Sequence, residues 1–301
     1  MNGILNINKP WGKTSFSIVV RVKQLTGERH IGHAGTLDPA ATGVLPICLG
    51  QGTRIVEFLM EATKVYQAQI ELGVATDTYD ATGNITYKGD SSGISRGQLE
   101  SALASFCGLI QQTPPMYSAV KYHGKPLYEL ARANIKVERR SRLTRIYHLE
   151  LTDWQPPVVT IEVVCGKGTY IRSLAHDLGE ALGCGANLKS LIRLRCGFFD
   201  IKDAISVPQL EDAFRYGYWQ RLVYPIDIVL LHWTTMIAGE ATARAIRNGC
   251  PLVLENSEQH SLASSSFDNH CRVYTSDGCF LGVLRFNPEK GQWQPEKVFH
   301  S

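Results

Sequence analysis

The residues best placed by type and spacing to do chemistry lie in one short stretch, residues 32–39, with the sequence GHAGTLDP. Glycines and a proline this close together are incompatible with a regular helix or a central strand, so the stretch is a shaped loop. It offers one imidazole and one carboxylate, His33 and Asp38. Apolar segments on both sides predict that Asp38 stands in a cleft, where an acidic residue is a candidate for chemistry. The alternative is a turn-forming Asp that bonds nearby backbone N–H groups.

The chain lacks the sequence motifs of several other reaction classes. There is no glycine-rich phosphate loop, no paired-carboxylate acid/base motif and no complete zinc-deaminase motif, in which His-x-Glu is joined by Pro-Cys-x-x-Cys. None of the eight cysteines belongs to a Cys-x-x-Cys pair, which argues against structural zinc. We therefore expect neither a metal nor a cofactor, and we expect the cysteines to stay reduced, most of them as small buried residues.

Segments in which apolar residues recur with the period of a strand or a helix flank the loop, and these elements must position it. Residues 3–10 alternate apolar and polar side chains and end at a proline, which predicts a strand. Thr14 or Ser15 then caps a helix that ends at Gly27. Residues 65–72 form a second strand, on whose pattern Tyr66 is an ordinary core residue. Further on, residues 158–165 predict a strand that leads, after a glycine turn, into a helix.

Positive charge is concentrated in the first two-thirds of the chain. Residues 121–145 contain eight Lys or Arg against two Glu, whereas residues after 237 contain six basic against seven acidic side chains. Tyrosines are interspersed in the basic stretch, and this mixture is typical of a nucleic-acid clamp. The alternative is that these charged residues form an ordinary solvent-exposed surface that binds no nucleic acid. The candidate phosphate-binding residues are Lys121, Lys136, Arg139, Arg140, Arg142 and Arg145.

The last part of the chain changes character. A short helix at residues 238–248 precedes a polar segment at 255–269 without clear periodicity. A hairpin at 271–286 and a strand at 293–298 follow. We expect these strands to complete a small β-barrel, which weakly resembles a PUA-type RNA-binding domain.

Four separate motifs resemble one known family. The loop GHAGTLDP, followed by ATGVLP at 41–46, resembles the signature of the TruB family of tRNA pseudouridine synthases. Lys9-Pro10 with Thr14-Ser15, the segment 64–83 and the segment 168–179 resemble further motifs of that family. The resemblance covers roughly residues 3–205. We interpret Lys9 as a residue that packs beside the loop.

The resemblance implies an α+β fold. It predicts a catalytic domain over residues 1–235, with a mixed, mostly antiparallel central sheet flanked by helices and loops. A basic RNA-clamping insertion is expected at about 112–146. Residues 236–301 would form the PUA-like domain.

The resemblance also assigns roles to single residues. Asp38 matches the catalytic carboxylate and Arg172 the arginine that pairs with it. Tyr66 would lie against the target uracil, while Tyr170 and Leu191 hold the pocket. His33 would occupy the space that the flipped base leaves.

The function implied is isomerisation of uridine 55 in the T loop of tRNA, after the base is flipped out of its stack. The continuation at 41–46 resembles the stand-alone bacterial branch rather than the guide-RNA-dependent branch. We therefore expect a cytoplasmic monomer that binds the tRNA T-arm without a guide RNA, a protein partner or a membrane. The alternatives are a guide-RNA-dependent synthase and a non-catalytic RNA-binding or tRNA-folding protein; a hydrolase using Asp38 and His33 is disfavoured.

Overall fold

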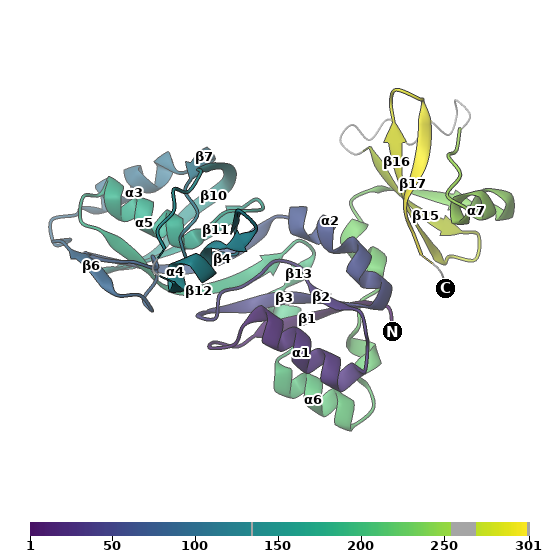
Figure 1. The fold of residues 1–301 in the computed structure, drawn as a ribbon, viewed down its shortest axis with the longest axis horizontal. Helices are drawn as coiled ribbons and strands as arrows, with labels where there is room; N and C mark the ends of the chain where they lie inside the picture. The colour runs from purple at the N-terminus through teal and green to yellow at the C-terminus, as the bar shows by residue number, and fades with distance from the viewer. Residues whose placement is uncertain (134, 254–268, 300–301) are drawn as a thin grey trace.

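The computed structural model describes residues 1–133, 135–253 and 269–299. These residues form one large mixed sheet and a separate small sheet at the C-terminal end (Figure 1). The strand order along the large sheet is β1-β3-β12-β4-β11-β10-β7, with β2 paired to β3 and β13 to β12. Its strands are β1 (Gly3–Lys9), β2 (Ile31–His33), β3 (Ala41–Leu49), β4 (Lys64–Leu72), β7 (Gly108–Gln112), β10 (Arg142–Gln155), β11 (Val158–Cys165), β12 (Ala186–Cys196) and β13 (Phe199–Asp200).

The large sheet confirms the expected mixed, mostly antiparallel architecture. Only β3 and β12 pair in parallel, and the other neighbours in the described sheet are antiparallel. Strand β4 lies between β12 and β11, and its inward side chains alternate as the sequence pattern predicts. The parallel pair brings residues that are far apart in the chain side by side within the sheet.

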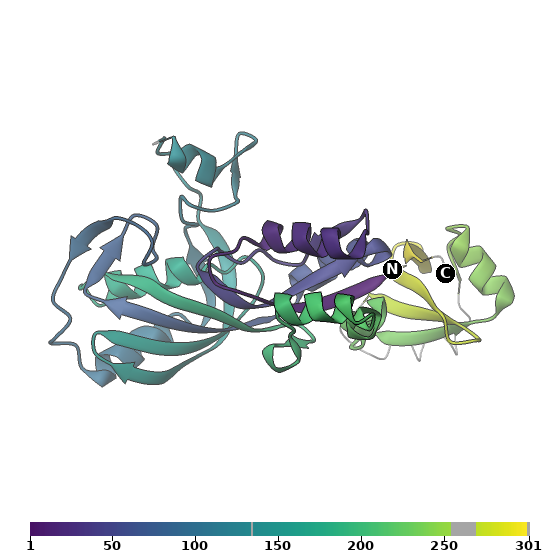
Figure 2. The same cartoon turned by 90° about the horizontal axis from the view of Figure 1, so that it is seen from below.

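Helices pack on the sheet around a continuous apolar core. Helix α5 contacts β12 and β4, and α3 contacts both α5 and β10. Helices α1 and α6 pack against each other near the β1 edge (Figure 2). The helices are α1 (Ser15–Thr26), α2 (Val56–Glu61), α3 (Arg96–Ser105), α5 (Ile171–Ala181) and α6 (Val207–Arg215), with short 3₁₀ turns at Gly50–Ile55, Ile201–Asp203, Trp219–Leu222 and Ile226–Leu230.

Helix α1 shows how local sequence sets a helix boundary. The Thr14 side chain accepts a hydrogen bond from the Ser17 backbone N–H, 3.0 Å away, and so caps the first turn. Gly27 ends the helix in the left-handed conformation, as the sequence predicted. Ile18 and Val22 lie on the buried face. These contacts fix where the chain enters α1, and this entry packs on the loop between β2 and β3.

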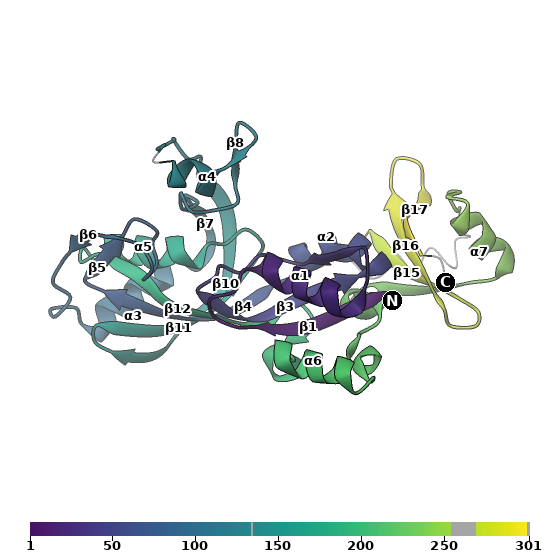
Figure 3. The ribbon, with the colours of Figure 1, turned by 60° about the horizontal axis from the view of Figure 1, so that its bottom comes forward.

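Two small hairpins leave the large sheet. Strands β5 (Val74–Thr76) and β6 (Ile85–Lys88) form the first. The second contains β8 (Lys121–Tyr122), β9 (Lys125–Pro126) and α4 (Leu127–Arg132), and it projects away from the sheet (Figure 3). It belongs to the basic segment 112–146, which we call the insertion.

The C-terminal part is an open sheet, so the expected closed barrel is wrong for the described residues. Its strand order is β14-β15-β16-β17, and β14 pairs in parallel with β15. The elements are β14 (Thr234–Ala238), α7 (Glu240–Arg247), β15 (His270–Thr275), β16 (Phe280–Asn287) and β17 (Gln292–Val298). The hairpin and the last strand are confirmed, while β14 was not predicted. The polar segment falls, from 255 to 268, outside the described residues.

None of the helices in the described part of the chain is both long enough and apolar enough to cross a bilayer.

Candidate active site

The loop that carries Asp38 connects β2 to β3, and residues at the start of α1 form hydrogen bonds with its backbone. The buried Ser15 hydroxyl donates to the Leu37 carbonyl at 3.1 Å and accepts from the Leu37 backbone N–H at 2.8 Å. The Gly12 N–H donates to the Pro39 carbonyl at 2.8 Å. Contacts on both sides of Asp38 therefore fix the loop backbone.

Lys9, at the end of β1, supports the same loop from inside the protein. Its side chain is fully buried, and Nζ donates to the carbonyls of Pro10 at 3.0 Å, Lys13 at 2.6 Å and Pro39 at 3.4 Å. Burial lowers the pKa of Lys9 from 10.5 to about 8, with Asp38 opposing this shift and Arg193 adding to it. The packing role expected for Lys9 agrees with these contacts.

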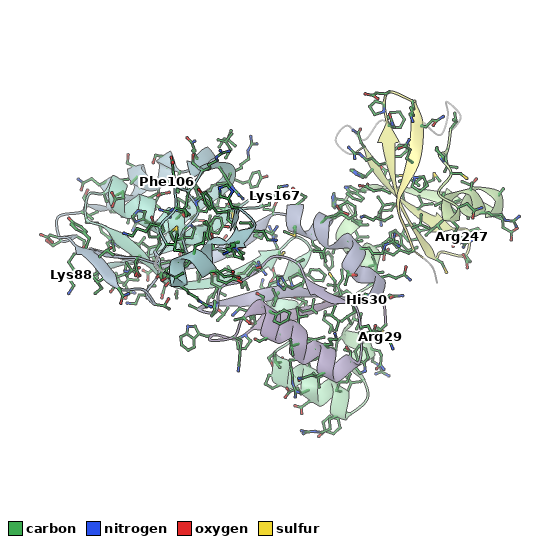
Figure 4. The ribbon with its side chains drawn as sticks, in the orientation of Figure 1. Arg29, His30, Lys88, Phe106, Lys167 and Arg247 are labelled. Atoms are coloured by element: carbon green, nitrogen blue, oxygen red, sulfur yellow. The ribbon has the colours of Figure 1, made fainter. Side chains whose placement is uncertain are left out.

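A pocket of about 270 Å³ opens above Asp38. Five of the six site residues expected around the substrate line it: Asp38, Tyr66, Tyr170, Arg172 and Leu191. The loop between β11 and α5 forms one wall; its Lys167, labelled in Figure 4, makes an ion pair with Glu61 of α2. The pocket thus combines one carboxylate with aromatic and apolar walls.

His33 lies in β2 and does not line this pocket. Burial lowers its pKa, with Arg193 as a second cause, so the ring is neutral near pH 7. Nδ1 is buried and has no hydrogen-bond partner among the described residues. Its role beside the flipped base stays a prediction.

Arg172 meets Asp38 side-on. Nε lies 3.0 Å from Oδ2, and Nη2 lies 3.2 Å from Oδ1, so both carboxylate oxygens are engaged. Arg172 is near the start of α5, where a cation opposes the helix dipole. The pair with Asp38, which the family resemblance implied, offsets that cost.

The rest of the Arg172 guanidinium contacts two further segments. Nη1 lies 3.6 Å from Oδ2 of Asp80 and donates to the Thr78 carbonyl at 3.4 Å. Nη2 also donates to the Tyr117 carbonyl at 2.8 Å, at the base of the insertion. Asp80 is held by Thr78 and Thr82, whose hydroxyls donate to its Oδ1 at 2.8 and 2.6 Å. Arg172 therefore couples the catalytic loop to the β5–β6 loop and to the insertion.

Opposing influences act on the ionisation of Asp38. The Asp38 side chain is 41% exposed. Protein atoms nevertheless surround the carboxyl group closely enough to remove much of its hydration. Desolvation raises the pKa of Asp38, Arg172 lowers it, Asp80 raises it and Lys9 lowers it; the net direction is upward. The site therefore holds a carboxyl group that protonates more readily than a surface Asp.

Arg193 lies on β12, two residues after Leu191 and on the same face of the strand. Its side chain is almost fully buried; Nε donates to the Val44 carbonyl at 2.6 Å and Nη2 to the Gly35 carbonyl at 3.0 Å. It also faces Tyr66, the residue opposite it on β4, and its positive charge opposes the upward shift in the pKa of that phenol. Burial raises the pKa of Tyr66 to about 12, so its phenol stays protonated. Arg193 thereby links the catalytic loop to Tyr66.

The close approach of β3 and β12 depends on a glycine. Gly43 has φ of +103°, and a Cβ built there would lie 2.3 Å from the Arg193 carbonyl oxygen. Any larger residue at this position would push the strands apart. The position of Arg193 relative to the catalytic loop therefore requires glycine at 43.

Family models match most of the chain. The N-terminal domain of the TruB family pseudouridylate synthases matches residues 23–171, and the tRNA pseudouridylate synthase B C-terminal domain matches residues 172–231. The tRNA pseudouridine synthase B of Dehalococcoides mccartyi is 42% identical over 300 residues, which cover 99% of this chain and 97% of the relative. This chain belongs to the TruB family. The synthase B of Geobacillus thermodenitrificans is 44% identical, covering 84% of this chain and 86% of its own.

Solved structures support the same fold. A chain from the crystal structure of a Cbf5-Nop10-Gar1 complex superposes with a TM-score of 0.76 at 26% identity, covering 99% of this chain and 85% of that one. A chain from an H/ACA RNP bound to a substrate RNA containing 2'-deoxyuridine superposes with a TM-score of 0.74 at 23% identity. It covers 99% of this chain and 85% of its own.

The basic residues of the TruB-family insertion separate into two groups. Lys121, Arg139, Arg140 and Arg142 line a second pocket of about 540 Å³ together with Tyr122 and His123. Arg139 also donates to the Pro114 carbonyl at 2.9 Å, so part of its role is structural. Lys136 and Arg145 are exposed outside this pocket.

Sequence reasoning missed two charged residues of the site, Asp80 and Arg193. Asp80 stood within a motif but received no role, although an acidic residue among threonines and a glycine invites a search for a partner. Arg193 follows Leu191 by two residues, and the period of a strand places such residues on one face. That spacing was the available signal for Arg193.

Proposed function

We propose that this chain is a tRNA pseudouridine synthase that isomerises uridine 55 of the T loop, with Asp38 as the catalytic carboxylate. The observation that carries the proposal is the side-on pair of Arg172 and Asp38 in a pocket lined by Tyr66, Tyr170 and Leu191. The 42% identical relative is named tRNA pseudouridine synthase B. Similarity over nearly the whole of both chains supports the same substrate class.

The pocket fits the steps of this reaction. The glycosidic bond must break, the uracil must turn, and a carbon–carbon bond must form, so the base has to leave its stack first. Tyr66 and Leu191 offer an aromatic and an apolar surface to a flipped base. Arg172 engages both Asp38 oxygens and favours the carboxylate form. That carboxylate can attack the sugar or remove a proton.

We further propose that the protonated Tyr66 phenol donates a hydrogen bond into the pocket. Arg193 faces Tyr66 across the β12–β4 pair, and in this proposal its guanidinium donates to the Tyr66 oxygen. The hydroxyl proton is then free to point toward a carbonyl of the bound uracil. A neutral phenol with a pKa of about 12 suits this role, because it keeps its proton throughout the neutral range.

We propose that the protein acts alone in the cytoplasm on the T-arm, with the insertion closing over the RNA and the part from about residue 236 as a second RNA contact. The test combines the purified protein with unmodified tRNA transcript and no other RNA or protein. Pseudouridine is then mapped by chemical labelling and primer extension. One stop at position 55 supports the proposal. Modification only after a guide RNA is added would favour the guide-dependent alternative, and binding without a stop would favour an RNA-binding protein.

A further inference from the structure

Two large aromatic side chains stand almost free of the protein next to the catalytic loop. Trp11 is 71% exposed and Phe16 is 70% exposed. Trp11 lies in the turn between β1 and α1, and Phe16 lies in the first turn of α1. Side chains of this size usually bury much of their surface. Neither ring is needed for the packing of the described fold.

The backbone that carries these rings is rigid and anchored to the active-site loop. Gly12 adopts φ of +78°, as a tight turn requires, and donates its N–H to the Pro39 carbonyl. The Lys13 carbonyl accepts from the buried Lys9, and Ser15 is bonded to Leu37. Trp11 and Phe16 therefore keep a fixed position relative to Asp38, although they project outward.

The start of α1 and the basic insertion stand on the same side of the large sheet (Figures 2 and 3). An RNA loop that delivers a base to the Asp38 pocket from that side would pass near both. Lys13, exposed between the two aromatic residues, adds a cation for a phosphate. Exposed rings beside a cation are the combination that binds unpaired nucleotides.

We propose that Trp11 and Phe16 form a stacking surface for unpaired bases of the substrate RNA that flank the target uridine. This inference rests on the proposed function. A protein partner is the weaker alternative because the exposed apolar surface is small. Beyond the two rings, α1 exposes Val20 and otherwise polar or charged residues such as Arg21, whereas a stable protein interface needs on the order of 1,000 Å².

The fluorescence of Trp11 gives a direct test. The other four tryptophans are buried or half-buried. Trp11 therefore supplies most of the tryptophan fluorescence that acrylamide can quench. The test uses the Asp38→Asn variant, which holds tRNA without turnover. Saturating tRNA is expected to protect this fraction from acrylamide, and the additional Trp11→Phe substitution should remove the protected signal. Unchanged quenching in a complex shown to be saturated by filter binding would overturn the inference.

Affinity measurements provide the second test. Trp11→Ala and Phe16→Ala should each weaken tRNA binding by about tenfold, the scale of one lost base–aromatic stack, while Trp11→Phe should restore most of it. The slope of affinity against salt should not change, because stacking releases no counterions. Tyr216→Ser, at an equally exposed aromatic residue after α6, is the matched control and should bind normally.

The two proposals fail in different ways. Normal pseudouridine formation with unchanged binding in Trp11→Ala and Phe16→Ala would overturn the stacking surface alone. Binding with Trp11 protected but without pseudouridine in the wild type would overturn the enzymatic function alone. Concentration-dependent dimerisation that Trp11→Ala abolishes, without any effect on RNA affinity, would assign the surface to a second copy of the chain and contradict the inference.

Discussion

Arg172 and Asp38 face each other with two short contacts, 3.0 Å from Nε to Oδ2 and 3.2 Å from Nη2 to Oδ1. The same guanidinium reaches Asp80 and the carbonyl of Tyr117 at the base of the insertion. One buried cation therefore contacts the proposed catalytic carboxylate, the β5–β6 loop and the base of the insertion. The first prediction follows from this arrangement.

Arg172→Lys keeps the charge but removes the planar fork that engages both carboxylate oxygens. We expect the single-turnover rate to fall by about 10- to 100-fold, because a hydrogen bond to a charged group contributes about 1.5–3 kcal/mol. Affinity for tRNA should change little. Rapid-quench measurement of pseudouridine at saturating enzyme checks this; a rate within twofold of the wild type would show that the fork is dispensable.

The pH dependence of the rate should report Asp38. Because burial and Asp80 raise the pKa of Asp38 above 3.8, the active carboxylate is present above that raised pKa and is lost as pH falls through it. Asp80→Asn removes one cause of the upward shift and preserves the side-chain shape. The acid limb of the single-turnover rate should therefore move to lower pH in this variant. An acid limb that stays in place or moves upward would contradict the electrostatic account.

Arg193 and Tyr66 should act as a unit. If Arg193 works by orienting the Tyr66 hydroxyl, removing either partner should cost nearly as much as removing both. We expect Arg193→Lys and Tyr66→Phe to be clearly non-additive in the rate constant, and Arg193→Lys combined with Lys88→Gln, on β6, to be additive. Rates and melting temperatures of all variants check this. Full additivity with Tyr66→Phe would reduce Arg193 to a support of the loop backbone.

The insertion should contribute charge rather than chemistry. Changing Arg140, Arg142 and Arg145 to Gln should weaken tRNA binding and reduce the slope of log affinity against log salt by about two to three, at roughly 0.7–0.9 per phosphate contact. A matched triple variant at Lys88, Lys202 and Arg215, which are exposed elsewhere, should keep the slope. Filter binding across a salt series measures both. Equal slopes for the two triples would show that the insertion does not contact phosphates.

The sequence predicted elements whose signals are local. The Thr14 cap, the left-handed Gly27 and the alternation along β4 depend on neighbouring residues, and the structure confirms them. Whether the C-terminal sheet closes into a barrel depends on pairing between strands that are far apart in the sequence. Strand β14 pairs with β15 across the polar segment, and the expected barrel is replaced by an open sheet in the described residues.

Some residues of the candidate site could be predicted from the sequence, and others could not. Motif resemblance found Asp38 and Arg172, and the structure places them in contact. Arg193 and Asp80 become visible only when separate strands and loops come together, since neither is near Asp38 in the chain. The burial of Lys9 likewise follows from its place beneath the loop rather than from its neighbours in sequence.

The measurement that tests the central claim most directly compares the wild type with Asp38→Asn on one tRNA transcript, with pseudouridine mapping and binding measured together. We expect a stop at position 55 with the wild type and none with Asp38→Asn. Affinity should remain within about tenfold, since phosphate contacts supply most of the binding. Near-normal pseudouridine formation by Asp38→Asn would contradict the assignment of Asp38 as the catalytic carboxylate.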